Sequence, residues 1–142
     1  MTTQEAPPKV ARPRPDPSDL SRPYFEGAKQ RKLLLQRNKR SGAYLFYSHY
    51  FDPADPDAEL EWVEASGKGK IYSFTIVRQH PHPFFMERLP YAYAIIELDE
   101  GVRLISNVLT DDVEALRCDM PVVVDFEDID DEIAVPVFRL AS

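Results

Sequence analysis

Two pairs of polar residues between positions 37 and 62 have the spacing of a metal-binding module. Asn38 and Ser41 are three residues apart, and after ten intervening residues Asp52 and Asp55 are also three apart. Zinc ribbons have this layout, but structural zinc is held by Cys sulfur and His nitrogen. Two aspartates could hold Ca²⁺ or Mg²⁺, yet those ions need more oxygen ligands than this set offers. We therefore expect a metal-free module whose amide and carboxylates hydrogen-bond turn backbone.

A second candidate site is the pair His80 and His82 in the stretch "RQHPHPFF". Both imidazoles could face one way on an extended proline-rich loop, which would suit a metal or acid/base chemistry. No third ligand lies near them in the sequence. The alternative is a loop between two barrel strands, stiffened by proline and packed by Phe84 and Phe85. If the loop is functional, we expect it to contact a ligand rather than to catalyse a reaction.

Motifs of known catalytic machinery are missing from the sequence. It contains no nucleophile elbow, phosphate-binding loop, dinucleotide glycine fingerprint or zinc-protease motif. Cys118 is the sole cysteine, so it cannot form an internal disulfide, and we expect a small core or near-core residue. The acidic run "EDIDDEIA" at 127–134 is predicted to be a solvated loop between the last two strands. We expect no enzymatic activity of the chain's own.

Composition and charge narrow the class of protein. Hydrophobic residues make up 44% and aromatic residues 11% of the 142 residues, enough for a globular core. Residues 59–142 carry seven Lys/Arg against seventeen Asp/Glu, a balance of −10 that repels phosphate backbones and disfavours nucleic-acid binding. There is no signal-peptide pattern, and the longest apolar runs are too short to span a membrane. We expect a cytoplasmic protein that binds neither nucleic acid nor membrane.

The chain reads as a tail followed by three structural parts. Residues 1–17 hold five of the thirteen prolines and are predicted to be a flexible tail. Residues 18–35 are predicted to form a helix capped by Ser18 or Ser21. Residues 36–61 are the ribbon-like module, and residues 62–142 are a β-barrel domain.

Alternating and β-branched stretches predict the strands of the barrel. After a bent lead-in at 62–66, the pattern gives three strands, a short helix at 110–117 and two further strands. This order is typical of a five-stranded OB barrel, with a small β-sandwich as the alternative. The predicted strands are "KIYSFTIVR", "YAYAIIEL", "VRLISNV", "VVVDFE" and "AVPVFRL".

Five stretches carry a resemblance to a known family: "RPYFEGAKQRKLLLQRNKRSG", "AELEWVEASGKGKIYSFTIV", "HPHPFF", "PYAYAIIELDEGVRLISNV" and "MPVVVDFEDIDDEIAVPVFR". Together they resemble, over nearly residues 20–140, the acyl-CoA-associated zinc-ribbon/OB-fold proteins known as domain of unknown function 35. The resemblance implies a mainly β protein: an N-terminal helix, a rubredoxin-like zinc ribbon and an OB barrel. The family's ribbon has two Cys-x-x-Cys pairs, and Asn38, Ser41, Asp52 and Asp55 stand in their place. The expected ribbon is therefore degenerate and metal-free, with no zinc cofactor.

The same resemblance implies a non-catalytic accessory subunit. Such proteins accompany thiolase-like enzymes, lipid-transfer-type aldolases or hot-dog hydratases that act on acyl-CoA thioesters, and a CoA thioester is a candidate ligand. The candidate partner-binding residues are Tyr24, Phe25, Phe84 and Phe85, which could instead pack on their own barrel. The candidate CoA-binding residues are Lys68, Lys70, Arg78, His80 and His82.

Without zinc, the ribbon needs another source of stability, because structural zinc supplies much of the folding free energy of such modules. We expect aromatic packing by Tyr44, Phe46, Tyr47, Tyr50 and Phe51, or contact with a partner. Two other functions stay open at this point. A nucleic-acid-binding OB module would use the aromatics of "KIYSFTIV" and the basic stretch "KQRKLLLQRNKR", and a stand-alone hydrolase or thioesterase would depend on His80 or His82.

Overall fold

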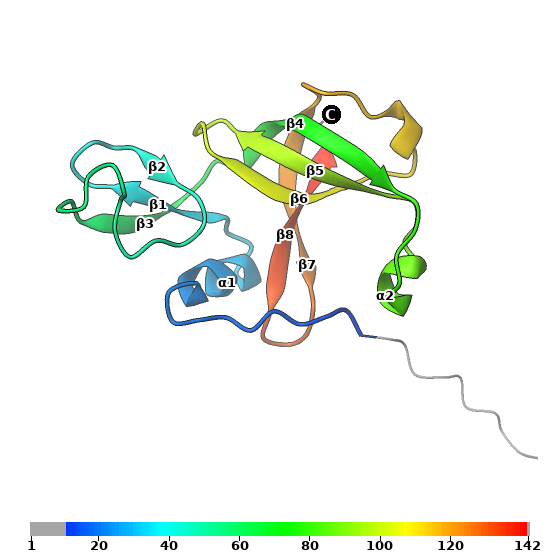
Figure 1. The fold of residues 1–142 in the computed structure, drawn as a ribbon, viewed down its shortest axis with the longest axis horizontal. Helices are drawn as coiled ribbons and strands as arrows, with labels where there is room; N and C mark the ends of the chain where they lie inside the picture. The colour runs from blue at the N-terminus through cyan, green and yellow to red at the C-terminus, as the bar shows by residue number, and fades with distance from the viewer. Residues whose placement is uncertain (1–10, 142) are drawn as a thin grey trace, which may run out of the picture.

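The computed structural model describes residues 11–141, which form a small three-stranded sheet and a closed five-stranded barrel (Figure 1). The small sheet has the order β2-β1-β3, and the barrel has the order β4-β5-β6-β8-β7. The first part of the chain comprises α1 (Arg22–Lys29), β1 (Leu34–Asn38), β2 (Tyr44–Leu45) and β3 (Leu60–Glu64). The barrel part comprises β4 (Lys68–Val77), α2 (Pro83–Met86), β5 (Tyr91–Leu98), β6 (Arg103–Leu109), the 3₁₀ helix η1 (Val113–Ala115), β7 (Pro121–Asp128) and β8 (Ala134–Leu140).

The barrel confirms the predicted OB fold. β5 shows how the sequence specifies it, because the alternate residues Ala92, Ala94, Ile96 and Leu98 are all buried in the interior. β5 pairs antiparallel with both β4 and β6, and a short parallel pairing of β6 with β8 closes the barrel. Phe138 on β8 is the largest fully buried side chain of the core.

Both predicted helices are shorter than the sequence pattern indicated. α1 ends at Lys29, and Arg31 takes a left-handed backbone (φ 63°) that turns the chain into β1. Leu33 and Leu35 are then buried in the core cluster, so packing ends the helix well before position 35. In the predicted helix at 110–117 the structure has only the 3₁₀ turn η1, because the chain extends at Leu116 to bury that side chain.

Two other expectations about local structure are corrected. Residues 60–64, partly assigned to the barrel as a lead-in, form β3 and pair with β1 in the small sheet. Cys118, expected in or near the core, is exposed. None of the helices within residues 11–141 has the length and hydropathy to cross a membrane.

The proline-rich segment at 11–17 lies against the barrel instead of extending into solvent as a tail; residues 1–10 of the predicted tail fall outside the described residues. A guanidinium nitrogen of Arg12 lies 2.9 Å from the carboxylate of Glu127. Arg14 pairs with Asp130 at 2.6 Å and with Glu132 at 3.1 Å. The acidic run predicted to be a solvated loop is therefore the anchor of the N-terminal segment. We call Glu127, Asp128, Asp130 and Glu132 the acidic hairpin.

The acidic hairpin also fixes the end of α1. Asp128 accepts a hydrogen bond of 3.1 Å from Lys29 Nζ and two of 2.9 Å from the Arg31 guanidinium. These hydrogen bonds, led by that of Arg31, lower the pKa of the Asp128 carboxyl group below its ordinary value. The Asp128 carboxylate therefore links α1, and the turn that follows it, to the C-terminal end of β7.

We expect Asp128→Asn to reduce the acid sensitivity of the fold. A carboxyl group whose pKa is lower in the folded state stabilises the fold above its unfolded pKa of about 4, and this contribution is lost as the pH falls through the folded value. The variant should be less stable than the wild type at pH 7 and should lose less further stability between about pH 4 and pH 2. Urea unfolding at a series of pH values measures both effects. Asp131→Asn, at an exposed neighbour, is the control, and equal pH profiles for both variants would contradict this role of Asp128.

Candidate partner-binding surface

Three of the four ribbon positions converge in the structure. Asn38, at the end of β1, donates through Nδ2 to Asp52 Oδ2 at 2.8 Å and to Asp55 Oδ2 at 3.3 Å. Its Oδ1 accepts the backbone N–H groups of Arg40 and Ser41 at 2.8 and 3.0 Å. The Ser41 hydroxyl instead accepts a hydrogen bond from the backbone N–H of Ala43. The Asn38 amide and the Asp52 carboxylate, which accepts the N–H of Ala54 at 2.9 Å, therefore bond to turn backbone as predicted. Among the described residues, the Asp55 carboxylate bonds only to side chains.

Arg40 supplies the positive charge of this network. Its Nε donates to Asp55 Oδ2 at 3.0 Å, and a second guanidinium nitrogen pairs with Oδ1. The Arg40 hydrogen bond, followed by that of Asn38, lowers the pKa of Asp55. Asn38 is fully buried and Asp52 is 6% exposed. Within residues 11–141 no group of three or more His, Cys, Asp or Glu is placed to hold a metal ion, and the metal-free state itself stays a prediction.

The aromatic residues of the ribbon divide into two sets. Tyr44 and Phe46 pack against the core cluster, as expected of residues that hold the ribbon together. Tyr50 and Phe51 are 84% and 53% exposed, so the expectation that they also stabilise the ribbon by packing is wrong for these two. Tyr47 is 58% exposed but packs its ring on Phe46, with centroids 4.7 Å apart. A packed ribbon needs only one set of inward-facing aromatics, and the loop after Phe46 carries the others out to solvent.

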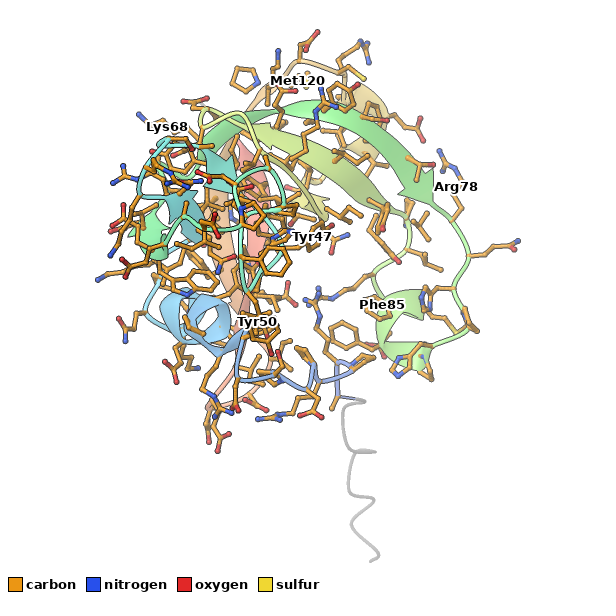
Figure 2. All side chains as sticks on the ribbon, turned by 60° about the vertical axis from the view of Figure 1, so that its left-hand side comes forward. Tyr47, Tyr50, Lys68, Arg78, Phe85 and Met120 are labelled. Atoms are coloured by element: carbon orange, nitrogen blue, oxygen red, sulfur yellow. The ribbon has the colours of Figure 1, made fainter. Side chains whose placement is uncertain are left out.

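The loop that holds the exposed aromatics is fixed by the buried side chain of Gln36. Gln36 Oε1 accepts the backbone N–H of His49 at 2.7 Å, and Gln36 Nε2 donates to the His49 carbonyl at 2.8 Å. The His49 ring in turn bonds to the carbonyl of Tyr47, which has a left-handed backbone (φ 59°). Figure 2 shows Tyr47 and Tyr50 on this side of the molecule, away from Phe85 and Arg78.

The outer face of the barrel continues the exposed apolar area. Tyr72, Tyr93 and Ile105 are 44%, 45% and 47% exposed. A hollow of about 250 Å³ is lined by Tyr47 of the ribbon loop and by Tyr72 and Ile105 of the barrel, so the two parts meet there. We call Tyr47, Tyr72, Tyr93 and Ile105 the aromatic surface. Apolar side chains gathered in this way on a solvent-facing surface are typical of a site that another molecule covers.

Sequence reasoning missed the aromatic surface, although part of its signal was present. The strands "YAYAIIEL" and "VRLISNV" alternate, so one set of residues had to face outward. The outward residues at 93 and 105 are Tyr and Ile, where a solvated sheet face usually carries polar side chains. Tyr47 gave no such signal, because its exposure depends on the left-handed turn of the loop.

The structure separates the predicted CoA-binding residues into two groups. Lys68 lies at the start of β4 and Arg78 just beyond its end, at opposite ends of the strand (Figure 2). Lys70 Nζ is 3.6 Å from Asp119, and Arg78 pairs with Glu114. Arg78, His80 and His82 follow one another after β4, so a ligand bound there would lie far from the two lysines.

The two histidines have a local structural role. His80 Nδ1 accepts the backbone N–H of His82 at 3.0 Å, and His82 Nδ1 accepts that of Phe84 at 3.1 Å. His82 thereby caps α2, and both imidazole rings pack on Phe85, with centroids 4.6 and 5.8 Å away. This agrees with the packed loop that the sequence left open as an alternative.

The four predicted partner-binding residues are half-buried against their own chain. Tyr24 packs on Phe46, with ring centroids 5.7 Å apart, and on Phe25. Two guanidinium groups lie near the Phe84 ring, that of Arg88 at 4.4 Å and that of Arg12 at 5.9 Å from its centroid. A role of these residues in partner binding stays a prediction.

A helix, a ribbon-like sheet and a closed barrel with an exposed aromatic surface define an OB-fold protein suited to contact another molecule. The family described as "ChsH2, C-terminal OB-fold domain" matches residues 62–127. A solved structure titled "Ltp2-ChsH2(DUF35) aldolase" contains a chain that is 35% identical, with a TM-score of 0.83, and the match covers 91% of this chain and 100% of that one. The chain belongs to the DUF35 OB-fold family.

Two curated proteins are also similar to this chain. A "Probable enoyl-CoA hydratase alpha subunit" of Thermomonospora curvata is 39% identical over 140 residues, which is 96% of this chain and 42% of that protein. A "DUF35 domain-containing scaffold protein" of Methanocaldococcus jannaschii is 36% identical over 78 residues, which is 54% of this chain and 55% of that protein. The chain therefore spans less than two thirds of either relative.

Proposed function

We propose that the chain is a non-catalytic accessory subunit that binds a hydratase or an aldolase acting on acyl-CoA thioesters. The observation that carries this proposal is the match over the whole length of the DUF35 chain in a structure titled as an aldolase. The name of the Thermomonospora curvata relative adds the hydratase class and the CoA thioester. The aromatic surface gives the physical means of binding, because covering exposed Tyr and Ile side chains supplies hydrophobic free energy.

The non-catalytic part of the proposal is supported by how the histidines are used. Each of His80 and His82 commits Nδ1 to a backbone N–H and packs its ring on Phe85, as expected for loop structure. The name of the Methanocaldococcus jannaschii relative, a scaffold protein, points the same way. We therefore assign the chemistry to the partner.

Co-purification with candidate thiolase-like aldolases and hot-dog hydratases tests the proposal. The wild-type chain should retain one of them, and Tyr47→Ser or Ile105→Asp should weaken that binding about 30-fold, as the loss of about 2 kcal/mol at a central apolar contact predicts. Val123→Asp is the matched control, since Val123 is 38% exposed on β7 and is not part of the aromatic surface. Binding curves by calorimetry give the ratio. Retention of no candidate, or equal weakening by Val123→Asp, would count against the proposal.

We also propose a CoA thioester as a ligand. It would bind to the complex of this chain with its partner rather than to one compact site on this chain. Its contacts would come from Arg78, His80 and His82 or from Lys68 and Lys70, but not from both groups together. The nucleic-acid alternative finds less support. Single strands bind where aromatic rings lie beside cationic grooves, and the Arg103 beside Tyr72 is paired with Glu97 at 3.1 Å.

A further inference from the structure

A cavity of about 450 Å³ lies between α1, the ribbon and the barrel. Its volume falls within the range of about 300 to 1,000 Å³ that binding sites usually have. No charged side chain lines it, although charged residues make up 29% of the whole sequence. Its walls include Tyr24 of α1, Tyr47 and Ser48 of the ribbon loop, Trp62 of β3 and Ile105 of β6.

Tyr24 gives the cavity one polar group without a partner. Its ring packs on Phe46 and Phe25, and burial, with a smaller effect of Tyr47, raises the pKa of its hydroxyl above the ordinary value. Within residues 11–141 this hydroxyl makes no hydrogen bond to another group of the chain, and its oxygen is still open to solvent at the cavity. A molecule in the cavity that accepts or donates a hydrogen bond would complete it.

Tyr47 connects the cavity to the aromatic surface. Its left-handed backbone is unfavourable for a residue with a side chain. The bonds from Gln36 to His49 hold the loop in this shape. Tyr47 and Ile105 line both the cavity and the hollow beside Tyr72, so a partner that covers the aromatic surface reaches the cavity as well.

We propose that the cavity receives a short uncharged segment of the partner subunit, which inserts a large apolar side chain and bonds to the Tyr24 hydroxyl. This inference rests on the proposed function and adds where the partner is anchored. An uncharged lining disfavours the phosphates of CoA, because a buried charge without a counter-charge is costly. The continuity with the aromatic surface favours a segment of the bound protein over a free ligand.

Trp62 allows a direct test, because it is the sole tryptophan of the chain and lines the cavity. The full chain is labelled with 5-fluorotryptophan and gives one ¹⁹F NMR resonance for this position. We expect the unlabelled partner retained in co-purification to shift that resonance, and octanoyl-CoA alone to leave it in place. Ser48→Phe, which places a ring in the cavity from the half-buried loop position, should weaken partner binding about tenfold or more.

Tyr24→Phe separates a binding role of the hydroxyl from a role in the fold. Because the hydroxyl has no partner in the free chain, we expect its removal to leave the unfolding midpoint unchanged or higher. Partner affinity should fall about fivefold, as the loss of one hydrogen bond of about 1 kcal/mol predicts. A lower unfolding midpoint with unchanged affinity would show that the hydroxyl serves the fold alone and would overturn its assigned role.

The other outcomes distinguish the two levels of the proposal. If the partner is retained but neither the Trp62 resonance moves nor Ser48→Phe weakens binding, the cavity inference is wrong and the accessory function stands. A shift caused by octanoyl-CoA alone would make the cavity a small-ligand site and would also overturn the inference. If no partner is retained, the accessory function fails and the cavity inference fails with it.

Discussion

Replacing Gly69 by Ala is expected to lower the free energy of unfolding by about 3 kcal/mol. Gly69 lies in β4 between two neighbouring strands, paired with Leu98 on β5 and with Val122 on β7. A Cβ atom at this position would lie 2.4 Å from the carbonyl oxygen of Glu97 and 3.0 Å from the Cα of Leu98. Both are backbone atoms of a paired strand, so they cannot rotate away as a side chain could. Urea unfolding followed by circular dichroism measures the loss.

Gly101→Ala is the matched control for Gly69→Ala. Gly101 has a φ of 89° in the tight turn between β5 and β6, and an added Cβ atom would meet no atom within 4 Å. The Gly101→Ala substitution should therefore lower the free energy of unfolding by only about 1 kcal/mol, the cost of holding Ala in a left-handed conformation. If the two variants lose equal stability, the barrel absorbs the contact at Gly69 by a small strand movement, and the predicted clash does not occur.

The second large effect is expected in the ribbon, where Asn38→Ala should cost about 3 kcal/mol. The substitution removes the 2.8 Å hydrogen bond to Asp52, whose carboxylate is 6% exposed. It also leaves the backbone N–H groups of Arg40 and Ser41 without their acceptor. Asp52 Oδ1 keeps the N–H of Ala54, but the buried Oδ2 loses its donor and still bears the cost of its desolvation. Hydrogen exchange should show the ribbon amides exchanging faster, and urea unfolding gives the total loss.

Ser41→Ala tests whether the effect belongs to the network or to the ribbon in general. Ser41 is exposed, and within the described residues its hydroxyl bonds only to the N–H of Ala43, so the loss of this hydroxyl should cost about 0.5 kcal/mol. Equal losses at positions 38 and 41 would contradict the network. A chelator that lowers the stability of the wild-type chain, together with stoichiometric zinc in the purified protein, would show that a metal holds the ribbon.

The partner-binding proposal and the ribbon network are physically connected. The ribbon carries Tyr47 on a loop whose shape depends on Gln36, and β1 contains both Gln36 and Asn38. Loosening β1 at its end would therefore disturb the position of Tyr47. In this way a network that performs no chemistry can still determine whether the aromatic surface is correctly formed.

The sequence by itself determined the order and type of most strands. The alternation in "YAYAIIEL" predicted the buried face of β5 correctly, because side chains in a strand alternate between faces whatever lies around them. The order of three strands, a break and two strands predicted the OB barrel. The spacing of Asn38, Ser41, Asp52 and Asp55 predicted a ribbon-like module, and the structure added that three of these side chains bond to one another. Each strand of this order is recognised from its own consecutive residues, whatever lies around it in the fold.

Only the tertiary structure decided which residues are available for binding. The pairing of Arg14 with Asp130 joins residues 116 positions apart, and no local pattern indicates such a contact. The same holds for the exposure of Tyr47, which depends on a buried side chain from another strand, and for the separation of Lys68 from Arg78, which follows from the length of β4. Periodicity encodes which way a side chain faces along its own strand. What covers that side chain is decided when the barrel closes and brings distant segments together.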